Sequence, residues 1–367
     1  MRFVEEYRDP RLARALADAI RRRATRTWTI MEVCGGQTHA IVQYGLDELV
    51  SPAVSLLHGP GCPVCVTPLE TLDLAVAIAE GSDAVLCSFG DMLRVPGSKH
   101  DLLGARARGG DVRVVYGPLD AARLAARTPG RRVVFLAVGF ETTAPAVAVA
   151  ARFARAQRLE NFFLLVSHVR VPPALEAIAG APDARVDAFL AAGHVCTVMG
   201  TAEYEPIAAR HRLPIVATGF EPIDILEGIA RAVASLEAGE AGVEIQYRRA
   251  VRPGGNPSAR ALIHEVFEVA DRPWRGIGLV PRGGLVLRGA YRAFDAAAAF
   301  AELAPPVAPR EPASCRAGDV LRGAIRPPEC GEFGRGCTPE RPLGAPMVSA
   351  EGACAAYWTH RAAELRA

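Results

Sequence analysis

The chain alternates along most of its length between short apolar runs rich in β-branched residues and alanine-rich segments, joined by glycine-containing loops. Continuous apolar strands that alternate with helices form parallel sheets covered by helices, so this pattern restricts the fold to the α/β class. Strands are predicted at 28–33, 54–58, 83–88, 112–116, 132–138, 161–167, 194–199 and 214–218. Helices are predicted near 9–24, 37–45, 68–80, 118–127, 145–157, 172–179, 203–211 and 222–238.

The order of these segments predicts two Rossmann-like parallel-sheet α/β domains and a smaller, less regular domain. An N-terminal helix at 1–25 is expected to pack with the C-terminal domain. The two α/β domains are expected at 26–128 and 129–239, and the irregular domain at 240–367. The second α/β domain carries two similar loops, VGFETTAP and TGFEPIDI, each directly after a predicted strand. Loops at the carboxyl ends of parallel strands form the ligand crevice of such sheets.

Composition narrows the functional class and the compartment. The formal net charge is only +2, which does not favour a nucleic-acid surface or an anionic membrane as partner. No apolar run approaches the roughly 20 residues that span a bilayer, and the N-terminus has no signal-peptide core. A cytoplasmic location is therefore expected, where thiols stay reduced. In that compartment clustered cysteines indicate metal ligands or redox groups rather than structural disulfides.

The segment HGPGCPVCVTPLE contains a C-x2-C pair, Cys62 and Cys65. Thr67, Pro68 and Glu70 fit a helix capping box, which would place Cys65 just before a helix N-terminus that favours a thiolate. The spacing allows a reversible disulfide. The alternative is half of a zinc site, and a second C-x2-C pair is missing, so the redox interpretation is favoured.

The segment EVCGGQTHAI places Cys34 directly after a predicted strand and His39 in the first turn of the next helix. A thiolate and an imidazole could bind iron or form a nucleophilic couple. Equally, His39 could only cap or pack the helix start. His58 could join Cys34 and the CPVC pair if neighbouring strand ends converge.

Four cysteines fall in the glycine- and proline-rich tail, with the spacing C-x14-C-x6-C-x16-C: Cys315, Cys330, Cys337 and Cys354. Four thiolates suit a [4Fe–4S] cluster or an all-cysteine zinc site, and the spacing matches neither a ferredoxin nor a zinc ribbon. Cys87 and Cys196 lie in strand-like runs and are predicted to be small buried hydrophobes. His168 and His194 are assigned core or capping roles by default.

The GFETTAP loop offers a carboxyl group, Glu141, and two hydroxyls, Thr142 and Thr143, at a strand end. Glu141 could serve as a general acid or base. A helix start with a hydroxyl N-cap and an acidic first turn explains the same residues, and spacing alone favours this structural role.

Together these segments resemble the HypD family of [NiFe]-hydrogenase maturation factors. The resemblance is carried by CGGQTHAI at 34–41, HGPGCPVCVTP at 58–68, GFETTAP at 139–145 and the tail segments CGEFGRGCTPE and MVSAEGACAAYW. These motifs appear in the family's order and span essentially the whole chain. The family architecture, two α/β units and a cluster domain, agrees with the pattern above.

The resemblance implies a scaffold on which the Fe(CN)2CO group of [NiFe]-hydrogenase is assembled. It implies a HypC-type chaperone and a HypE-type cyanide donor as partners, with the hydrogenase large subunit as the final recipient. Cys34 would hold a transient Fe(II) that carries CN and CO ligands, with His39 nearby. Cys62 and Cys65 would be the redox pair, and GFETTAP with Glu141 would line the same cleft. The four tail cysteines would bind a [4Fe–4S] cluster that supplies electrons through the Cys62/Cys65 dithiol.

Two other classes stay open at the level of sequence. A free-standing iron-sulfur thiol-disulfide oxidoreductase would act without a partner chaperone, and it leaves CGGQTH unexplained. A zinc-stabilised binding module would be colourless and redox-inactive. The resemblance describes a maturation scaffold with redox activity, for which the word enzyme is partly a matter of definition.

Overall fold

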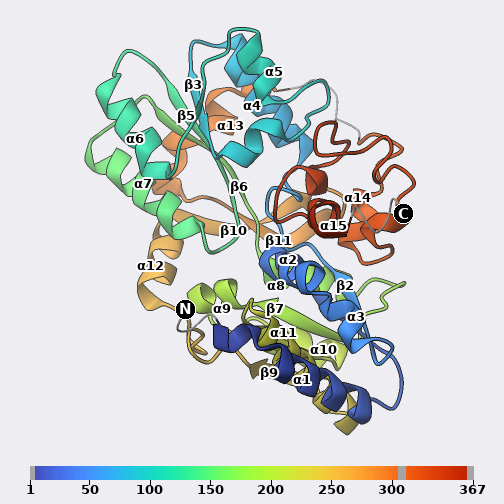
Figure 1. Ribbon diagram of the computed structural model, residues 1–367. Helices are drawn as coiled ribbons and strands as arrows, with labels where there is room; N and C mark the ends of the chain where they lie inside the picture. Colours follow the sequence, from blue (N-terminus) through green and yellow to red (C-terminus); the bar gives the residue numbers. More distant parts are fainter. Residues whose placement is uncertain (1–4, 305–310, 362–367) are drawn as a thin grey trace.

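The computed structural model describes residues 5–304 and 311–361, and it is an α/β structure with two parallel sheets (Figure 1). The strands are β1 Trp28–Glu32, β2 Val54–His58, β3 Val85–Ser88, β4 Val112–Val114, β5 Val133–Gly139, β6 Phe162–His168, β7 Ala188–Ala192, β8 Pro214–Thr218, β9 Gly242–Ile245, β10 Phe267–Trp274 and β11 Gly278–Leu287. The helices are α1 Pro10–Arg23, α2 Gly35–Tyr44, α3 Leu46–Val50, α4 Leu69–Gly81, α5 Leu102–Ala107, α6 Pro118–Arg127, α7 Ala144–Ala156, α8 Val171–Ala179, α9 Gly193–Met199, α10 Glu205–His211, α11 Pro222–Ala238, α12 Pro257–Val266, α13 Ala296–Ala299, α14 Ala317–Leu321 and α15 Ala353–Arg361. The predicted fold class is thus confirmed, with the antiparallel pair β10–β11 as part of a smaller irregular region.

The two sheets do not follow the predicted division at residue 128. The first sheet has the order β2-β1-β7-β8-β9, and the second has the order β4-β3-β5-β6. Each sheet therefore takes strands from both sides of that boundary. In the first sheet, β1 pairs in parallel with β7, and the register places Ile30 beside Ala188. A pattern of local periodicity cannot reveal which strands pair, since pairing depends on contacts far apart in the chain.

One predicted strand is a helix. Residues 194–199 lie in α9, and the strand of this region is the preceding segment, β7. The β-branched residues of HVCTVM favoured a strand, but β7 ends at Ala192, α9 begins at Gly193, and the buried face of α9 packs Val195 and Cys196 into the core. Strand propensity reflects packing on a half-buried surface, so tertiary contacts can override it.

The N-terminal helix α1 packs mainly against α11 and α3, on the first sheet, whereas the sequence analysis expected the C-terminal domain as its partner. Its face of Ala13, Ala17 and Ile20 is buried in the apolar core beneath that sheet. Asp9 caps the helix by accepting the amide of Arg11 at 2.7 Å. The sequence does not indicate these partners, because an amphipathic helix shows which of its faces is buried but not which element covers that face.

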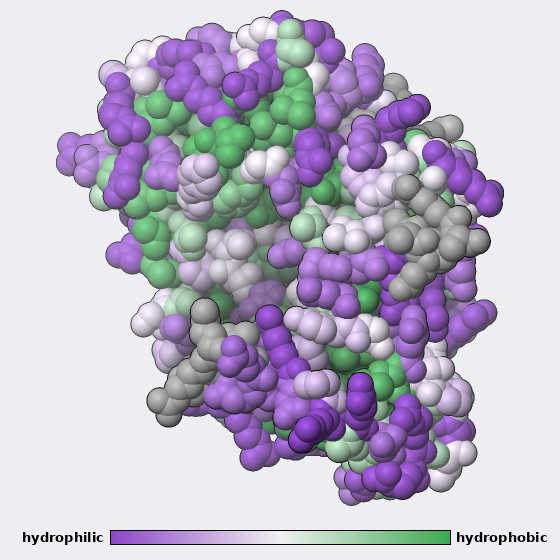
Figure 2. All heavy atoms as spheres, in the orientation of Figure 1, coloured by the Kyte–Doolittle hydropathy of each residue, from purple (hydrophilic) through white to green (hydrophobic). Residues whose placement is uncertain are grey.

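The tail, drawn in red, lies beside the junction of the two α/β parts, and the β10–β11 hairpin runs through the middle of the molecule (Figure 1). The face of the molecule shown in Figure 2 is hollowed between its upper and lower parts. The hairpin reaches the loops of both parts: the Arg275 amide donates to Val66 O at 2.8 Å, and the Arg170 amide donates to Gly283 O at 3.0 Å. No helix among the described residues is long and apolar enough to cross a membrane.

Candidate functional site

Cys34 occupies the N-cap position of α2, directly beyond the end of β1, with extended backbone. Its amide donates to Glu32 Oε2 at 2.8 Å. The other carboxylate oxygen of Glu32 accepts a hydrogen bond from the Thr38 hydroxyl and lies 2.8 Å from His58 Nδ1. His58 Nε2 in turn lies 3.1 Å from the hydroxyl of Tyr357 on α15. This buried network fixes the backbone of Cys34 from three separate segments of the chain.

The HGPGC loop is held directly against Cys34 by its glycines. Gly59 N donates to Glu32 O at 2.8 Å, and Gly35 N donates to Gly61 O at 2.9 Å. A Cβ atom on Gly61 would lie 2.3 Å from Cys34 N, a distance that no real side chain tolerates. Only glycine permits this approach of two backbones, so the CGGQTH and HGPGC motifs form one structure.

This close approach makes a testable prediction for stability. Gly61→Ala should lower the free energy of unfolding by about 1–3 kcal/mol, because the new methyl group must push the loop away from Cys34. Gly130→Ala is the matched control, since a Cβ atom there meets nothing within 4 Å. Denaturant unfolding of both variants measures the difference. Equal stability of the two variants would contradict the packing described here.

His194, at the start of α9, faces the thiol of Cys34. Its Nδ1 lies 3.6 Å from Cys34 Sγ. Burial lowers the pKa of His194 to about 4, and burial also raises the pKa of the Cys34 thiol. At neutral pH the pair is therefore an uncharged imidazole beside an uncharged thiol. Metal binding would displace the thiol proton, as it does at other cysteine sites.

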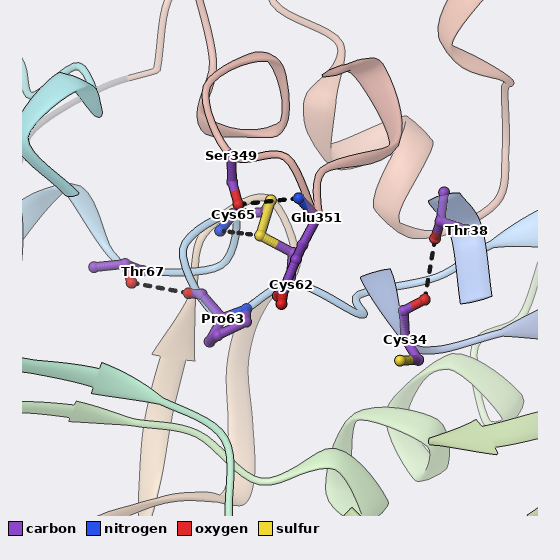
Figure 3. The surroundings of a disulfide bond; sticks show 8 residues. All are labelled: Cys34, Thr38, Cys62, Pro63, Cys65, Thr67, Ser349 and Glu351. Atoms are coloured by element: carbon purple, nitrogen blue, oxygen red, sulfur yellow. Dashed lines mark hydrogen bonds between the residues drawn. A yellow bond between two sulfur atoms is a disulfide. The ribbon is translucent and has the colours of Figure 1, made fainter. Parts of the chain in front are cut away.

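Cys62 and Cys65 form a disulfide, and both are buried. Within the loop, the Cys65 amide donates to Cys62 Sγ at 3.2 Å. Ser349 and Glu351 of the tail lie against the disulfide, and Cys34 lies on the neighbouring strand end (Figure 3). The C-x2-C spacing thus allows the two sulfur atoms to form a disulfide, as predicted.

The predicted capping box at this loop is wrong. Pro68, in extended conformation, is the N-cap residue of α4, and the helix begins at Leu69. The hydroxyl of Thr67 donates to Pro63 O at 2.9 Å instead of capping the helix. The chain turns back on itself in this loop, which places the Thr67 hydroxyl next to the Pro63 carbonyl.

His39 does not face Cys34, contrary to the expectation. Its Nε2 lies 3.2 Å from Nε2 of His360, on α15. Position 39 is one turn into α2, so its side chain points to the helix that packs on α2 rather than back to the N-cap. The imidazole beside Cys34 is His194, to which the sequence pattern assigned only a core or capping role.

The four tail cysteines line one pocket: Cys315, Cys330, Cys337 and Cys354. Apolar side chains such as Val320, Phe333 and Met347 form much of the remaining wall. In the described part of the chain, no three His, Cys, Asp or Glu side chains are close enough to share one metal ion. The four thiols therefore line a shared cavity but do not converge on one metal position.

The chemistry of this pocket fits a [4Fe–4S] cluster. Such a cluster takes four thiolates, and hydrogen bonds to the sulfur atoms tune its potential. The Leu343 amide donates to Cys337 Sγ at 3.3 Å. Burial raises the pKa of Cys315, and a backbone hydrogen bond from Ala317 offsets part of that increase. A Cβ atom on Gly344 would lie 2.6 Å from Cys315 Sγ, so glycine keeps this side of the sulfur clear.

Glu141 lies at the end of β5 and is buried, with Oε1 accepting the Val171 amide at 3.0 Å and Oε2 without a partner. Burial raises the pKa of Glu141 to about 7. Thr143 is the N-cap residue of α7, and its hydroxyl donates to Phe140 O at 3.1 Å, while Thr142 is half-buried. Phe140 packs in the same apolar core as the loop cysteines, so GFETTAP borders that core while Glu141 itself turns toward α8.

The raised pKa of Glu141 predicts a pH-dependent effect on stability. The folded protein binds this proton more tightly than the unfolded chain, so ionisation costs stability progressively from the ordinary pKa, 4.5, to about 7. Glu141→Gln removes that cost. Relative to the unsubstituted protein, the variant should gain stability over this range, by at most roughly 3 kcal/mol. Unfolding measured at both ends of the range tests this, and a constant difference between the two proteins would contradict the raised pKa.

The residues that sequence reasoning missed are His194, Glu32 and Tyr357. A signal for His194 existed, because it follows β7 as Cys34 follows β1, but the strand predicted at 194–199 concealed it. Glu32, two residues before Cys34 at a strand end, was visible as a carboxylate in an apolar run. Nothing local marks Tyr357, which reaches His58 only through the packing of α15.

Known proteins are similar in sequence to this chain over nearly its whole length. The family model HypD, described as the hydrogenase formation hypA family, matches residues 11–361. Hydrogenase maturation factor HypD of Rhodobacter capsulatus is 45% identical, with 99% of this chain and 100% of the relative covered. Hydrogenase maturation factor HypD of Escherichia coli is 44% identical, with both chains fully covered, and that of Azotobacter vinelandii is 44% identical over 98% of this chain and 97% of the relative. The chain belongs to the HypD family.

Proposed function

We propose that this protein is a hydrogenase maturation factor that serves as the scaffold for the Fe(CN)2CO group of [NiFe]-hydrogenase. The observation that carries the proposal is the junction of the CGGQTH and HGPGC loops. It places a buried thiol, Cys34, against an imidazole and beside the Cys62–Cys65 disulfide. The full-length similarity to relatives named hydrogenase maturation factors supports the same role.

Cys34 is the residue that would hold the cargo iron, with His194 as a second donor. Thiolate and imidazole suit iron that carries strong-field ligands, and a neutral imidazole has a free lone pair. Gly36 is exposed, and a Cβ atom there would lie 3.7 Å from Cys34 Sγ. The absence of a side chain leaves an approach to the sulfur. A HypC-type chaperone and a HypE-type cyanide donor would reach the iron from this side, before the iron group passes to the hydrogenase large subunit.

The Cys62–Cys65 pair would store two electrons beside the cargo. Reduction of the disulfide takes up two electrons and two protons and gives two thiols. When bound by the tail cysteines, a [4Fe–4S] cluster would supply single electrons for this reduction. The tail segment with Ser349 and Glu351 lies against the disulfide (Figure 3), and Cys354 follows three residues after Glu351 on α15. The proposed electron source and the dithiol are thus joined by one short segment.

A free-standing thiol-disulfide oxidoreductase fits the structure less well. Exchange with an external disulfide requires access to a sulfur atom, and both Cys62 and Cys65 are buried. That class also leaves unused the contact between Cys34 and His194.

Genetic complementation tests the proposed function. The chain should restore hydrogenase activity to a bacterial strain that lacks its own HypD, when the other maturation proteins are present. Cys87→Ala is the control variant, because this buried thiol lies on β3 and has no part in the proposed site. If the chain is expressed and folded but restores no activity, and the strain's own HypD does, the proposal is contradicted.

A further inference from the structure

Two histidines from distant parts of the chain meet where α15 packs on α2. The Nε2 atoms of His39 and His360 lie 3.2 Å apart, with ring centroids 4.5 Å apart and planes inclined by 81°. Both residues are half-buried, so the pair is not sealed from solvent. His39 belongs to the CGGQTH motif, yet the proposed iron site does not use it.

This pairing differs from the carboxylate contacts that three other histidines make. His58, His100 and His211 each contact a glutamate side chain. His39 and His360 instead contact one another. Two imidazoles repel when both are protonated. Burial and the charge of His39 lower the pKa of His360, which favours the neutral form with a free lone pair.

The spacing of the two nitrogens fits a shared metal ion. Zinc binds histidine nitrogen at about 2.0–2.1 Å in tetrahedral geometry, which places two ligand nitrogens roughly 3.3 Å apart. The observed separation of 3.2 Å is close to this value. An N–H···N hydrogen bond has a similar length, so the two interpretations must be separated by experiment.

We propose that His39 and His360 form a two-imidazole site for a divalent transition-metal ion such as Zn²⁺ or Ni²⁺, with water completing the coordination. The ion would join α2, which begins beside Cys34, to α15, which carries Cys354. It would thus tie the proposed iron site to the cysteine pocket. The inference is independent of the proposed function, because it concerns residues that the scaffold chemistry does not use.

Calorimetric titration with Ni²⁺ alone tests the site, using the anaerobically purified full-length protein with its cysteine pocket filled. The variants His39→Gln and His360→Gln should each weaken Ni²⁺ binding by at least about tenfold, because one of two chelating nitrogens is lost. The control His211→Gln should bind Ni²⁺ as the unsubstituted protein does, and Cys34→Ala should keep the Ni²⁺ binding that depends on His39 and His360. His211 is a suitable control because it is a half-buried imidazole that contacts Glu176.

A second measurement covers the possibility that a variant folds poorly. Ni²⁺ should raise the melting temperature of the unsubstituted protein and of Cys34→Ala, but not that of either glutamine variant at positions 39 and 360. Unchanged binding in both glutamine variants would overturn the proposal. So would loss of binding in Cys34→Ala, which would place the ion at the iron site, or no measurable Ni²⁺ binding by the unsubstituted protein.

Discussion

Cys34→Ser is expected to remove the cargo iron from the protein and to reduce hydrogenase maturation to background. The serine hydroxyl occupies nearly the same space but is a far weaker ligand for soft or borderline metals than a thiolate. His194 alone would then face the iron, and a single imidazole does not retain it. The four tail cysteines lie in a separate pocket and should keep the [4Fe–4S] cluster proposed for them. Iron analysis of the variant, purified with a HypC-type partner, should give only the iron that the cluster requires.

Cys87→Ser is the matched control for this prediction. Cys87 is also buried, and burial likewise raises its pKa, to about 12, but it lies on β3 away from the loop junction. Its serine variant should keep both the cargo iron and the maturation activity. Full iron loading and normal maturation by Cys34→Ser would show that the cargo is held elsewhere.

Cys65→Ser is expected to stop hydrogenase maturation while leaving the tail cluster intact. The substitution removes the disulfide and with it the two-electron store proposed beside Cys34. Cys34 and its contact with His194 should persist, because the amide of Cys34 is held by Glu32 rather than by the disulfide. The visible absorption of the cluster and the maturation activity are measured on the same preparations.

The two cysteine variants therefore differ in what they lose. Cys65→Ser should still bind iron at Cys34 but should not complete the group, whereas Cys34→Ser should not bind it at all. Normal maturation by Cys65→Ser would contradict the redox role of the dithiol, without bearing on the role of Cys34.

Much of the fold follows from local pattern, and the arrangement of the sheets does not. Predicted helices such as 118–127 and 222–238 match α6 and α11, because amphipathic periodicity and proline at the first turn are local signals. The pairing of β1 and β2 with β7 and β8 in one sheet depends on contacts between distant segments, so the sequence pattern did not show that each sheet takes strands from both sides of residue 128. The hairpin β10–β11 was likewise absent from the prediction.

The candidate site divides in the same way. Glycine-rich loops at strand ends marked Cys34, Cys62 and Cys65, since such loops meet at one edge of a parallel sheet. The meeting of the four tail cysteines in one pocket also agrees with their clustering in the sequence. The contact of Cys34 with His194 was not predicted, because His194 begins the helix after β7 and is brought to Cys34 only by the pairing of β1 with β7.

Infrared spectroscopy of the protein purified anaerobically with its HypC-type partner, from cells that supply all other maturation proteins, tests the central claim most directly. We predict metal-bound cyanide and carbonyl stretching bands, together with more iron than the tail cluster accounts for, and the loss of both in Cys34→Ser. A brown, iron-containing protein without those bands would contradict the scaffold role and favour the oxidoreductase. Zinc in place of iron would contradict the electron pathway as well.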